Sequence, residues 1–245
     1  MTWQEVQDLL AKTELILVPI GSLEQHGPHL PLGTDTVLAS EIAGRAASKA
    51  DVALSPAIPV GFSIEHMNFP GTISLNVETM MRIVKEISES LIRHGFRKIL
   101  YVNAHGGNSG ILQSTMQLLK HDHKAIFCLA NIWELAKPDY KNILESKAEE
   151  IGHADEFETS MLLAIDENKV RSCRIASAGH MKIKSIHPFT IASMGWLAWK
   201  AEDYSKTGVI GDPRKALKKK GDQLLNKIVD RLVDQIEEIR KMQIT

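Results

Sequence analysis

Short apolar runs alternate along the chain with longer segments in which apolar residues recur at helical spacing. The run ELILVPIG at 14–21 is continuously apolar and ends in glycine, which is typical of a strand buried on both faces. The segment 76–95 predicts the clearest helix, with Asn76 as a capping residue and Gly95 as its end. Its apolar positions share one helical face: Met80, Ile83, Val84, Ile87 and Leu91.

The same patterns divide most of the remaining chain into strands and helices. Strands or extended segments are predicted at 14–21, 51–61, 97–104 and 124–133. Helices are predicted at 34–50, 76–95, 111–122, 155–168 and 214–242, the last open to an interruption near Gly221. This alternation predicts an α/β fold: a three-layer α/β/α sandwich with a mainly parallel central sheet, formed as a single domain over 1–245.

One segment, 184–213, lacks clear periodicity. It contains Trp196, Trp199 and Tyr204. Long segments without regular structure are often functional, and aromatic residues are enriched where subunits meet. We therefore expect this segment to be a functional loop or a subunit contact.

Charge and cysteine content narrow the class of protein. The 29 basic and 30 acidic residues give a net charge of -1, which provides no broad basic face for nucleic acid. The two cysteines, Cys128 and Cys173, have no CxxC spacing and indicate a reducing compartment. The polar N-terminus is unlike a signal peptide, and no apolar run approaches the ~20 residues that cross a bilayer. We expect a cytoplasmic protein with a small-molecule substrate and no nucleic-acid or membrane partner.

Side chains that can bind metals follow two of the predicted strands. Glu24, His26 and Asp35 lie in 21–35, after the first strand, and His105 follows the strand at 97–104. In parallel α/β sheets, ligands bind beyond the carboxyl ends of the strands, so these side chains are expected to meet. Two imidazoles and two carboxylates suit Zn²⁺, Mn²⁺ or Fe²⁺. Such sites often hold two metals roughly 3.5–4 Å apart, and Asp35 is the candidate bridge.

A third polar cluster, GHADEFETS, spans 152–160. His153 is a candidate general acid and base, and Glu158 is a candidate to complete the metal shell. A purely structural role is an open alternative for several of these residues. Asp35 or Thr34 would suit the cap of helix 34–50, and Asp155 with Glu158 fits the spacing of a capping box.

The remaining candidates concern the substrate. Backbone N–H groups of Gly106, Gly107 and Asn108 are candidates to hold an oxyanion, although HGGN also resembles part of a phosphate-binding loop. His66 either orients substrate or caps a turn, and His29 is expected to be structural. No G-x-S-x-G motif occurs and neither cysteine has a neighbouring His motif, so the attacking group is expected to be water activated by metal.

These motifs together resemble the creatininase family of metal-dependent amidohydrolases. The matching stretches are VPIGSLEQHGPHLPLGTD, FPGTISL, NAHGGN, GHADEFETS and TGVIGDPRKA. The resemblance implies a single α/β/α domain, assembled as a homohexamer, that holds two divalent metal ions. It also implies that Glu24, His26, Asp35 and His105 are metal ligands, with Asp35 bridging, and that His153 is the proton shuttle.

Two departures from the family pattern concern a metal ligand and the substrate wall. Creatininase proper has a glutamate ligand where this chain has Gly107, which makes Glu158 the expected replacement. It also has a Trp shortly before the shuttle His, whereas KAEEIGH here contains no aromatic residue.

The expected activity is therefore hydrolysis of a C–N amide bond in a small cyclic or formylated substrate. The family also includes archaeal deformylases of a formylamino-pyrimidine ribotide and a peptide-trimming enzyme. The deformylase branch is one alternative, and a non-catalytic metal- or nucleotide-binding protein is another.

Overall fold

A four-stranded parallel sheet forms the middle layer of the protein, in a computed structural model that describes residues 1–179 and 198–244. The strands are β1 (Leu15–Ile20), β2 (Ala53–Leu54), β3 (Lys98–Asn103) and β4 (Ile126–Asn131), in the order β2-β1-β3-β4. Leu15 pairs with Lys98, and Lys98 pairs with Ile126. The predicted mainly parallel sheet is confirmed.

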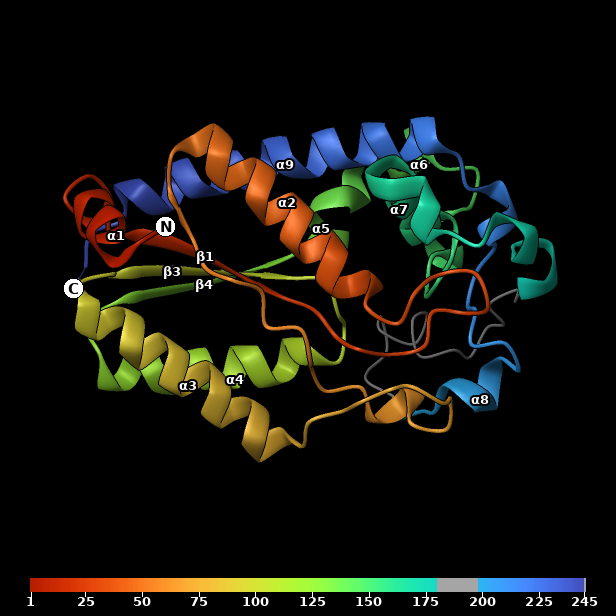
Figure 1. The fold of residues 1–245 in the computed structure, drawn as a ribbon, viewed down its shortest axis with the longest axis horizontal. Helices are drawn as coiled ribbons and strands as arrows, with labels where there is room; N and C mark the ends of the chain where they lie inside the picture. Colours follow the sequence, from red (N-terminus) through yellow and green to blue (C-terminus); the bar gives the residue numbers. More distant parts are fainter. Residues whose placement is uncertain (180–197, 245) are drawn as a thin grey trace.

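Helices cover both faces of this sheet (Figure 1). The helices are α1 (Trp3–Leu10), α2 (Thr34–Ala50), α3 (Val77–His94), α4 (Asn108–Asp122), α5 (Ile132–Ala136), α6 (Tyr140–Ile143), α7 (Glu156–Asp166), α8 (Ala201–Tyr204) and α9 (Lys218–Lys241). Figure 1 shows α2, α5, α7 and α9 on one side of the sheet and α3 with α4 on the other. The three-layer α/β/α prediction is therefore confirmed.

Alternation along β1 explains why two layers of helices form. Leu15 and Leu17 pack into the core that contains residues of α2 and α9. Ile16 and Val18 pack into the opposite core, with residues of α3 and α4. Successive side chains of a strand point to opposite faces, so a continuously apolar strand requires cover on both sides.

Helix boundaries mostly follow the predicted capping residues. Asn76 caps α3 by accepting the Thr79 N–H at 2.7 Å, and Gly95 ends the helix. Helix α4 begins at Asn108, three residues before its predicted start. The strand predicted at 124–133 ends at Asn131 because Ile132 already begins α5.

The C-terminal helix differs from its prediction at its first turns. It begins at Lys218 after a separate turn at Pro213–Lys215, and it continues through Gly221 without interruption. A Cβ added to Gly221 would lie 1.9 Å from the main-chain oxygen of Ser160 in α7. This glycine therefore permits close packing of α9 on α7, and the predicted interruption is wrong.

The less regular segments agree only in part with the sequence patterns. Within 51–61 only Ala53–Leu54 forms a strand, with one further bridge between Ile58 and Ile20. Of the aperiodic segment 184–213, the part up to residue 197, including Trp196, lies outside the described residues. In the described ranges, no helix combines the length and apolar composition needed to cross a membrane.

Candidate metal centre

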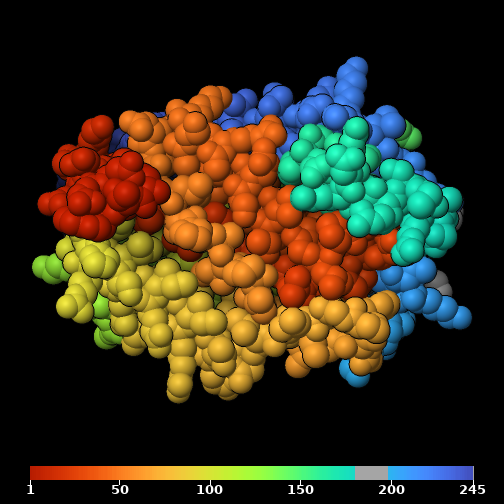
Figure 2. Space-filling model, in the orientation of Figure 1, coloured from red at the N-terminus to blue at the C-terminus, as the bar shows by residue number. Residues whose placement is uncertain are grey.

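The predicted site residues meet beyond the carboxyl ends of β1 and β3. The segment 21–35 joins β1 to α2, His105 follows β3, and residues 153–158 lead into α7. His153 is held there by paired main-chain hydrogen bonds with Ile210, both 2.8 Å long. Figure 2 shows the segment after β1 (red-orange) at the surface between α7 (teal) and the amber segment that precedes α3.

The Asp35 carboxylate lies between two imidazoles. Its Oδ1 is 2.9 Å from His26 Nε2, and its Oδ2 is 3.4 Å from His105 Nδ1. All three side chains are at least 95% buried. One carboxylate thus faces both of the histidines that were predicted to be ligands.

Two groups of possible ligands surround this carboxylate. The strand-end group consists of Glu24, Asp35 and His105, and the helix-side group consists of His26, His153 and Glu158. Within each group the ligand atoms lie within 4.8 Å of one another. The structure therefore brings together all five predicted ligands and the predicted shuttle.

The two groups differ in how closely their atoms approach. In the strand-end group, His105 Nδ1 lies 3.0 Å from Glu24 Oε2. In the helix-side group, His26 Nε2 lies 3.8 Å from Glu158 Oε2, and that oxygen also accepts the Ala154 N–H at 2.5 Å. Glu158 is thus shared between the start of α7 and the site.

Main-chain carbonyl groups orient three of the imidazole rings. His26 donates its Nδ1–H to Glu24 O at 3.1 Å, His105 its Nε2–H to Phe62 O at 2.7 Å, and His153 its Nε2–H to Gln25 O at 2.7 Å. A carbonyl oxygen only accepts hydrogen bonds, so the anchored nitrogen carries the proton. The other nitrogen of each ring then faces the carboxylates, as in proteins whose metal-binding His is fixed by a second hydrogen bond.

Two buried serines connect the strand-end group through hydroxyl groups. Ser22 Oγ donates to Glu24 Oε2 at 2.6 Å and lies 2.6 Å from Ser63 Oγ. Since the Ser22 proton is used on Glu24, the Ser63 hydroxyl donates to Ser22. Ser63 Oγ is also 3.3 Å from His105 Nε2. The chain of hydroxyls therefore fixes both the carboxylate and the imidazole, although neither serine was predicted from the sequence.

Burial and neighbouring charges give the two histidines of the helix-side group opposite protonation. Burial favours the neutral form of His26, but the charge and hydrogen bond of the Asp35 carboxylate prevail and raise its pKa to about 10. For His153, burial and the nearby charge of His26 lower the pKa well below its usual range. Burial raises the pKa of Glu158 to about 8. His153 is therefore neutral beside a charged neighbour.

The donor set fits a divalent metal centre. Among the described residues, Glu24 Oε1 and Asp35 Oδ2 are buried oxygens without a hydrogen-bond partner. Buried carboxylate oxygens without partners are costly unless a proton or cation compensates them. Imidazole nitrogens and carboxylate oxygens at this spacing are ligands that Zn²⁺ and Mn²⁺ accept.

The capping alternatives have different outcomes. Gly33 occupies the capping position of α2, which has no side-chain cap, so neither Thr34 nor Asp35 caps this helix. Asp155 does cap α7, accepting the N–H groups of Phe157 and Glu158. The capping box is incomplete, because Glu158 reaches Ala154, which has a left-handed φ of 51°, rather than Asp155.

Within the HGGN stretch, Asn108 supports the scaffold and Gly107 lies where no side chain fits. The Asn108 side chain donates to Gly21 O at 3.0 Å and accepts the Phe62 N–H at 3.0 Å, and its own N–H donates to His105 O. Asn108 therefore joins three segments of the scaffold, and its role in binding substrate stays a prediction. A Cβ at Gly107 would lie 2.3 Å from Phe62 O, so the family's glutamate does not fit here.

Two further residues adjoin the centre through His66. The ring of His66 is 2% exposed and stacks on His153 with centroids 4.5 Å apart, and it lies at 86° to the Trp199 ring with centroids 5.8 Å apart. Gln25 Nε2 lies 2.8 Å from His66 Nδ1. Trp199 thus supplies an aromatic residue beside His66, which itself stacks on His153, from a segment 46 positions after His153 rather than before it. Neither Trp199 nor Gln25 was identified as a site residue from the sequence.

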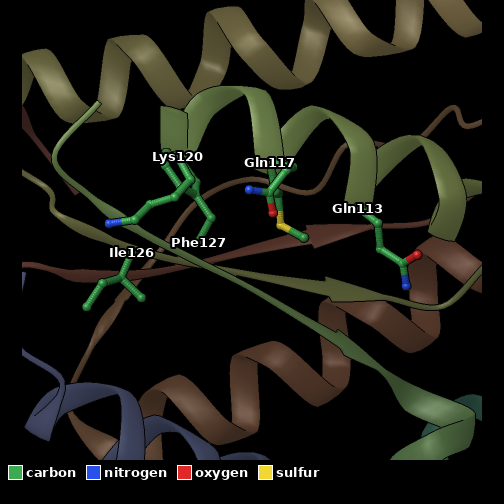
Figure 3. Close-up of a pocket in the computed structure, with 6 residues that line it drawn as sticks. Gln113, Gln117, Lys120, Ile126 and Phe127 are labelled. Atoms are coloured by element: carbon green, nitrogen blue, oxygen red, sulfur yellow. The ribbon is translucent and has the colours of Figure 1, made fainter. Parts of the chain in front are cut away.

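Other candidate features lie apart from the centre. His29 Nε2 lies 2.9 Å from Thr159 Oγ1, and His29 belongs to neither ligand group, as expected for a structural residue. A surface cavity of about 400 Å³ lies between α4 and the edge strand β4 (Figure 3). The residues that line this cavity are Gln113, Met116, Gln117, Lys120, Ile126 and Phe127. None of them is a predicted site residue.

Comparison with known proteins identifies similar sequences over most of the chain. The family model described as "Creatininase: Creatinine amidohydrolase" matches residues 1–236. The mycofactocin precursor peptide peptidase of Mycolicibacterium smegmatis is 30% identical over 237 residues, covering 94% of this chain and 87% of the peptidase. The creatinine amidohydrolase of Pseudomonas putida is 26% identical over 260 residues, covering 97% of this chain and 95% of that enzyme.

Solved structures show the same fold. A crystal structure of creatinine amidohydrolase superposes with a TM-score of 0.87 at 23% identity, covering 99% of this chain and 97% of that one. Similar creatininase structures include one named for Mn and one named Zn-Zn type. A shorter match, 33% identical over 44% of this chain and 49% of the relative, is a formylamino-pyrimidine ribotide deformylase of Methanococcus maripaludis.

Proposed function

The chain belongs to the creatininase family, which includes hydrolases of amide bonds, and we propose that it hydrolyses a C–N amide bond at a centre of two divalent metal ions. Glu24, Asp35 and His105 would hold one ion, and His26 with Glu158 would hold the other, with Asp35 shared. Metals bound at such residues lower the pKa of water and polarise a substrate carbonyl. Zn²⁺, Mn²⁺ and Fe²⁺ all suit this donor set.

The position of the Asp35 carboxylate is the observation that carries this proposal. Its two oxygens face two different imidazoles, at 2.9 and 3.4 Å, and Oδ2 has no hydrogen-bond partner among the described residues. A single structural ion pair would need one histidine and one carboxylate. A carboxylate between two ligand groups instead suits a shared ligand.

His153 is suited to move the proton that the reaction requires. Its Nε2–H is fixed on Gln25 O, its neutral Nδ1 faces the site 3.7 Å from Glu24 Oε1, and its ring is only 6% exposed. Water that adds to the carbonyl must lose a proton, and the leaving nitrogen must gain one. In this proposal His153 accepts the first at Nδ1 and returns it to the nitrogen.

Substitution of His153 tests the proton-transfer role. His153→Ala is expected to keep both metals and to lower kcat by about 10²- to 10⁴-fold, the usual contribution of general acid–base catalysis. Metal content is measured by elemental analysis and kcat by amide hydrolysis. A loss below threefold would contradict the role, and loss of a metal would make His153 a ligand instead.

The substrate class follows less directly from the site. We propose a small cyclic or formylated amide, with the backbone N–H groups of Gly106 and Gly107 beside the reacting carbonyl. The test is hydrolysis by the metal-loaded protein of creatinine, a formylamino-pyrimidine nucleotide and simple lactams. Stoichiometric metal binding without hydrolysis of any amide would favour a non-catalytic binding protein.

A second candidate is cleavage of a peptide. The supporting observation is the similarity to the mycofactocin precursor peptide peptidase over 94% of this chain. Under this proposal the metal-loaded protein cleaves a peptide library faster than the small amides, and His153→Ala lowers both activities by about 10²- to 10⁴-fold. Hydrolysis restricted to formylated or cyclic amides would reject this candidate.

A further inference from the structure

The amide of Gln25 has a fixed orientation beside the metal centre. Gln25 is 5% exposed, and its Oε1 accepts the Gly27 N–H at 2.9 Å. Its Nε2 donates to Gly208 O at 3.2 Å. A main-chain N–H only donates and a carbonyl oxygen only accepts, so the oxygen and nitrogen of this amide cannot be exchanged.

This orientation determines the tautomer of His66. Gln25 Nε2 lies 2.8 Å from His66 Nδ1, and an amide nitrogen donates but does not accept. His66 Nδ1 is therefore the acceptor and carries no proton. The neutral ring then holds its proton on Nε2, which is the reverse of the arrangement that anchors His26, His105 and His153.

The Nε2–H of His66 points into the centre. Its nearest charged atom is Glu24 Oε1 at 3.5 Å, and in the described part of the chain Nε2 makes no hydrogen bond. The ring contacts His153, at 4.5 Å and 29°, and makes a T-shaped contact with Trp199. Because a nitrogen that carries a proton has no lone pair to share, His66 is excluded as a metal ligand in this tautomer, although Glu24, His66 and His153 lie close enough to form a ligand group.

We propose that His66 is a catalytic hydrogen-bond donor to the carbonyl oxygen of the scissile amide, and that Gln25 is the positioning residue that keeps the proton on Nε2. This inference rests on the proposed amide hydrolysis. As water adds to the carbonyl carbon, the C–O bond forms and negative charge develops on the carbonyl oxygen. The C–N bond then breaks and the water proton passes through His153 to the leaving nitrogen, while His66 keeps its own proton throughout. A buried donor already aimed at the developing charge stabilises it without reorganisation.

Two variants separate this role from a structural one. His66→Phe keeps a ring between His153 and Trp199 but removes the N–H. Gln25→Glu keeps the imidazole and replaces the donating amide by a carboxylate, which draws the His66 proton to Nδ1 and leaves a lone pair on Nε2. Each variant is expected to lower kcat by about 10²- to 10³-fold, the usual effect of losing one oxyanion donor. KM changes less than threefold and two metals remain bound.

The measurements are kcat and KM with the best amide substrate, metal content, and the histidine tautomers by ¹⁵N NMR of the Zn²⁺-loaded protein. The wild-type spectrum is expected to show His66 protonated on Nε2. The spectrum of Gln25→Glu is expected to show the proton on Nδ1 instead. His123→Phe, a change of the same type after the far end of α4, is the control and is expected to keep kcat within threefold. If the wild type hydrolyses amides but both variants keep its kcat, the inference about His66 fails alone. Loss of a metal from His66→Phe would also overturn it, whereas a wild type with no amide hydrolysis would refute the proposed function itself.

Discussion

The two ligand groups share a boundary at Asp35 but are built on different supports. The strand-end group stands on segments that leave neighbouring strands, and the hydroxyls of Ser22 and Ser63 fix its side chains. The helix-side group takes Glu158 from α7, whose position depends on packing against α9. Its carboxylate also serves the Ala154 N–H. Under the proposed two-metal centre, we therefore expect the strand-end group to be preorganised and to bind the first metal, and the helix-side group to bind the second metal more weakly.

The largest expected effect breaks both groups at once. Asp35→Ala removes the carboxylate between the two imidazoles, so both metals are expected to be lost and amide hydrolysis to fall below detection. Elemental analysis after dialysis measures the metal content, and circular dichroism checks the fold. Retention of both metals with full hydrolysis would show that Asp35 is not a shared ligand.

A smaller effect separates the two groups. Glu158→Gln removes the carboxyl group from the helix-side group while an amide oxygen remains to accept the Ala154 N–H. One metal is expected to remain bound at near wild-type affinity and the second to be lost during dialysis. The affinities are measured by competition with a chelator. Equal weakening of both metals would contradict the assignment of separate groups.

Changing the serine chain is expected to weaken the first metal's binding rather than the second's. Ser22→Ala removes the hydroxyl bound to Glu24 and is expected to weaken the first metal by about 10- to 100-fold, as for other residues that orient metal ligands. Ser88→Ala is the control. Ser88 is also fully buried, but it lies in α3 and its hydroxyl is 2.8 Å from Tyr101 OH, apart from both ligand groups. If Ser22→Ala and Ser88→Ala bind the first metal with equal affinity, the serine chain does not orient the ligands.

The smallest effect acts through helix packing. Gly221→Ala places a Cβ against Ser160 O and is expected to destabilise the protein by about 1–3 kcal/mol, the usual cost of overpacking. Because α7 carries Glu158, the affinity for the second metal is expected to fall a few-fold while the affinity for the first is unchanged. Thermal unfolding and chelator competition measure the two effects. Weakening of the first metal alone would contradict the difference in support.

Most of the sheet and the group of candidate ligands could be predicted from the sequence because both depend on local patterns. The continuous apolar run at 14–21 predicted β1, and residues of metal-binding type after two predicted strands indicated Glu24, His26, Asp35 and His105 as candidates. The ambiguity at Glu158 could not be resolved in this way. A glutamate three residues after Asp155 suits a helix cap and a ligand equally, and its carboxylate in fact lies beside both Ala154 and His26.

The features that escaped prediction depend on contacts distant in sequence. The tautomer of His66 follows from Gln25, whose orientation depends on Gly208, 183 positions away. The aperiodic segment concealed the contact of Trp199 with His66 because a single ring contact leaves no periodic pattern. The glycine at 221 within α9 is likewise explained by the close approach of α7. Helix propensity alone gives no information about that neighbour.

The narrow space at Gly107 limits how the site can be redesigned. Any side chain there would meet Phe62 O, the His105 ring and, at 3.0 Å, Glu65 Oε1. A glutamate placed here, as in creatininase proper, would therefore displace the Phe62 main chain before it could supply a ligand. Introducing such a ligand by design would require rebuilding the segment that carries Phe62 and Glu65 first.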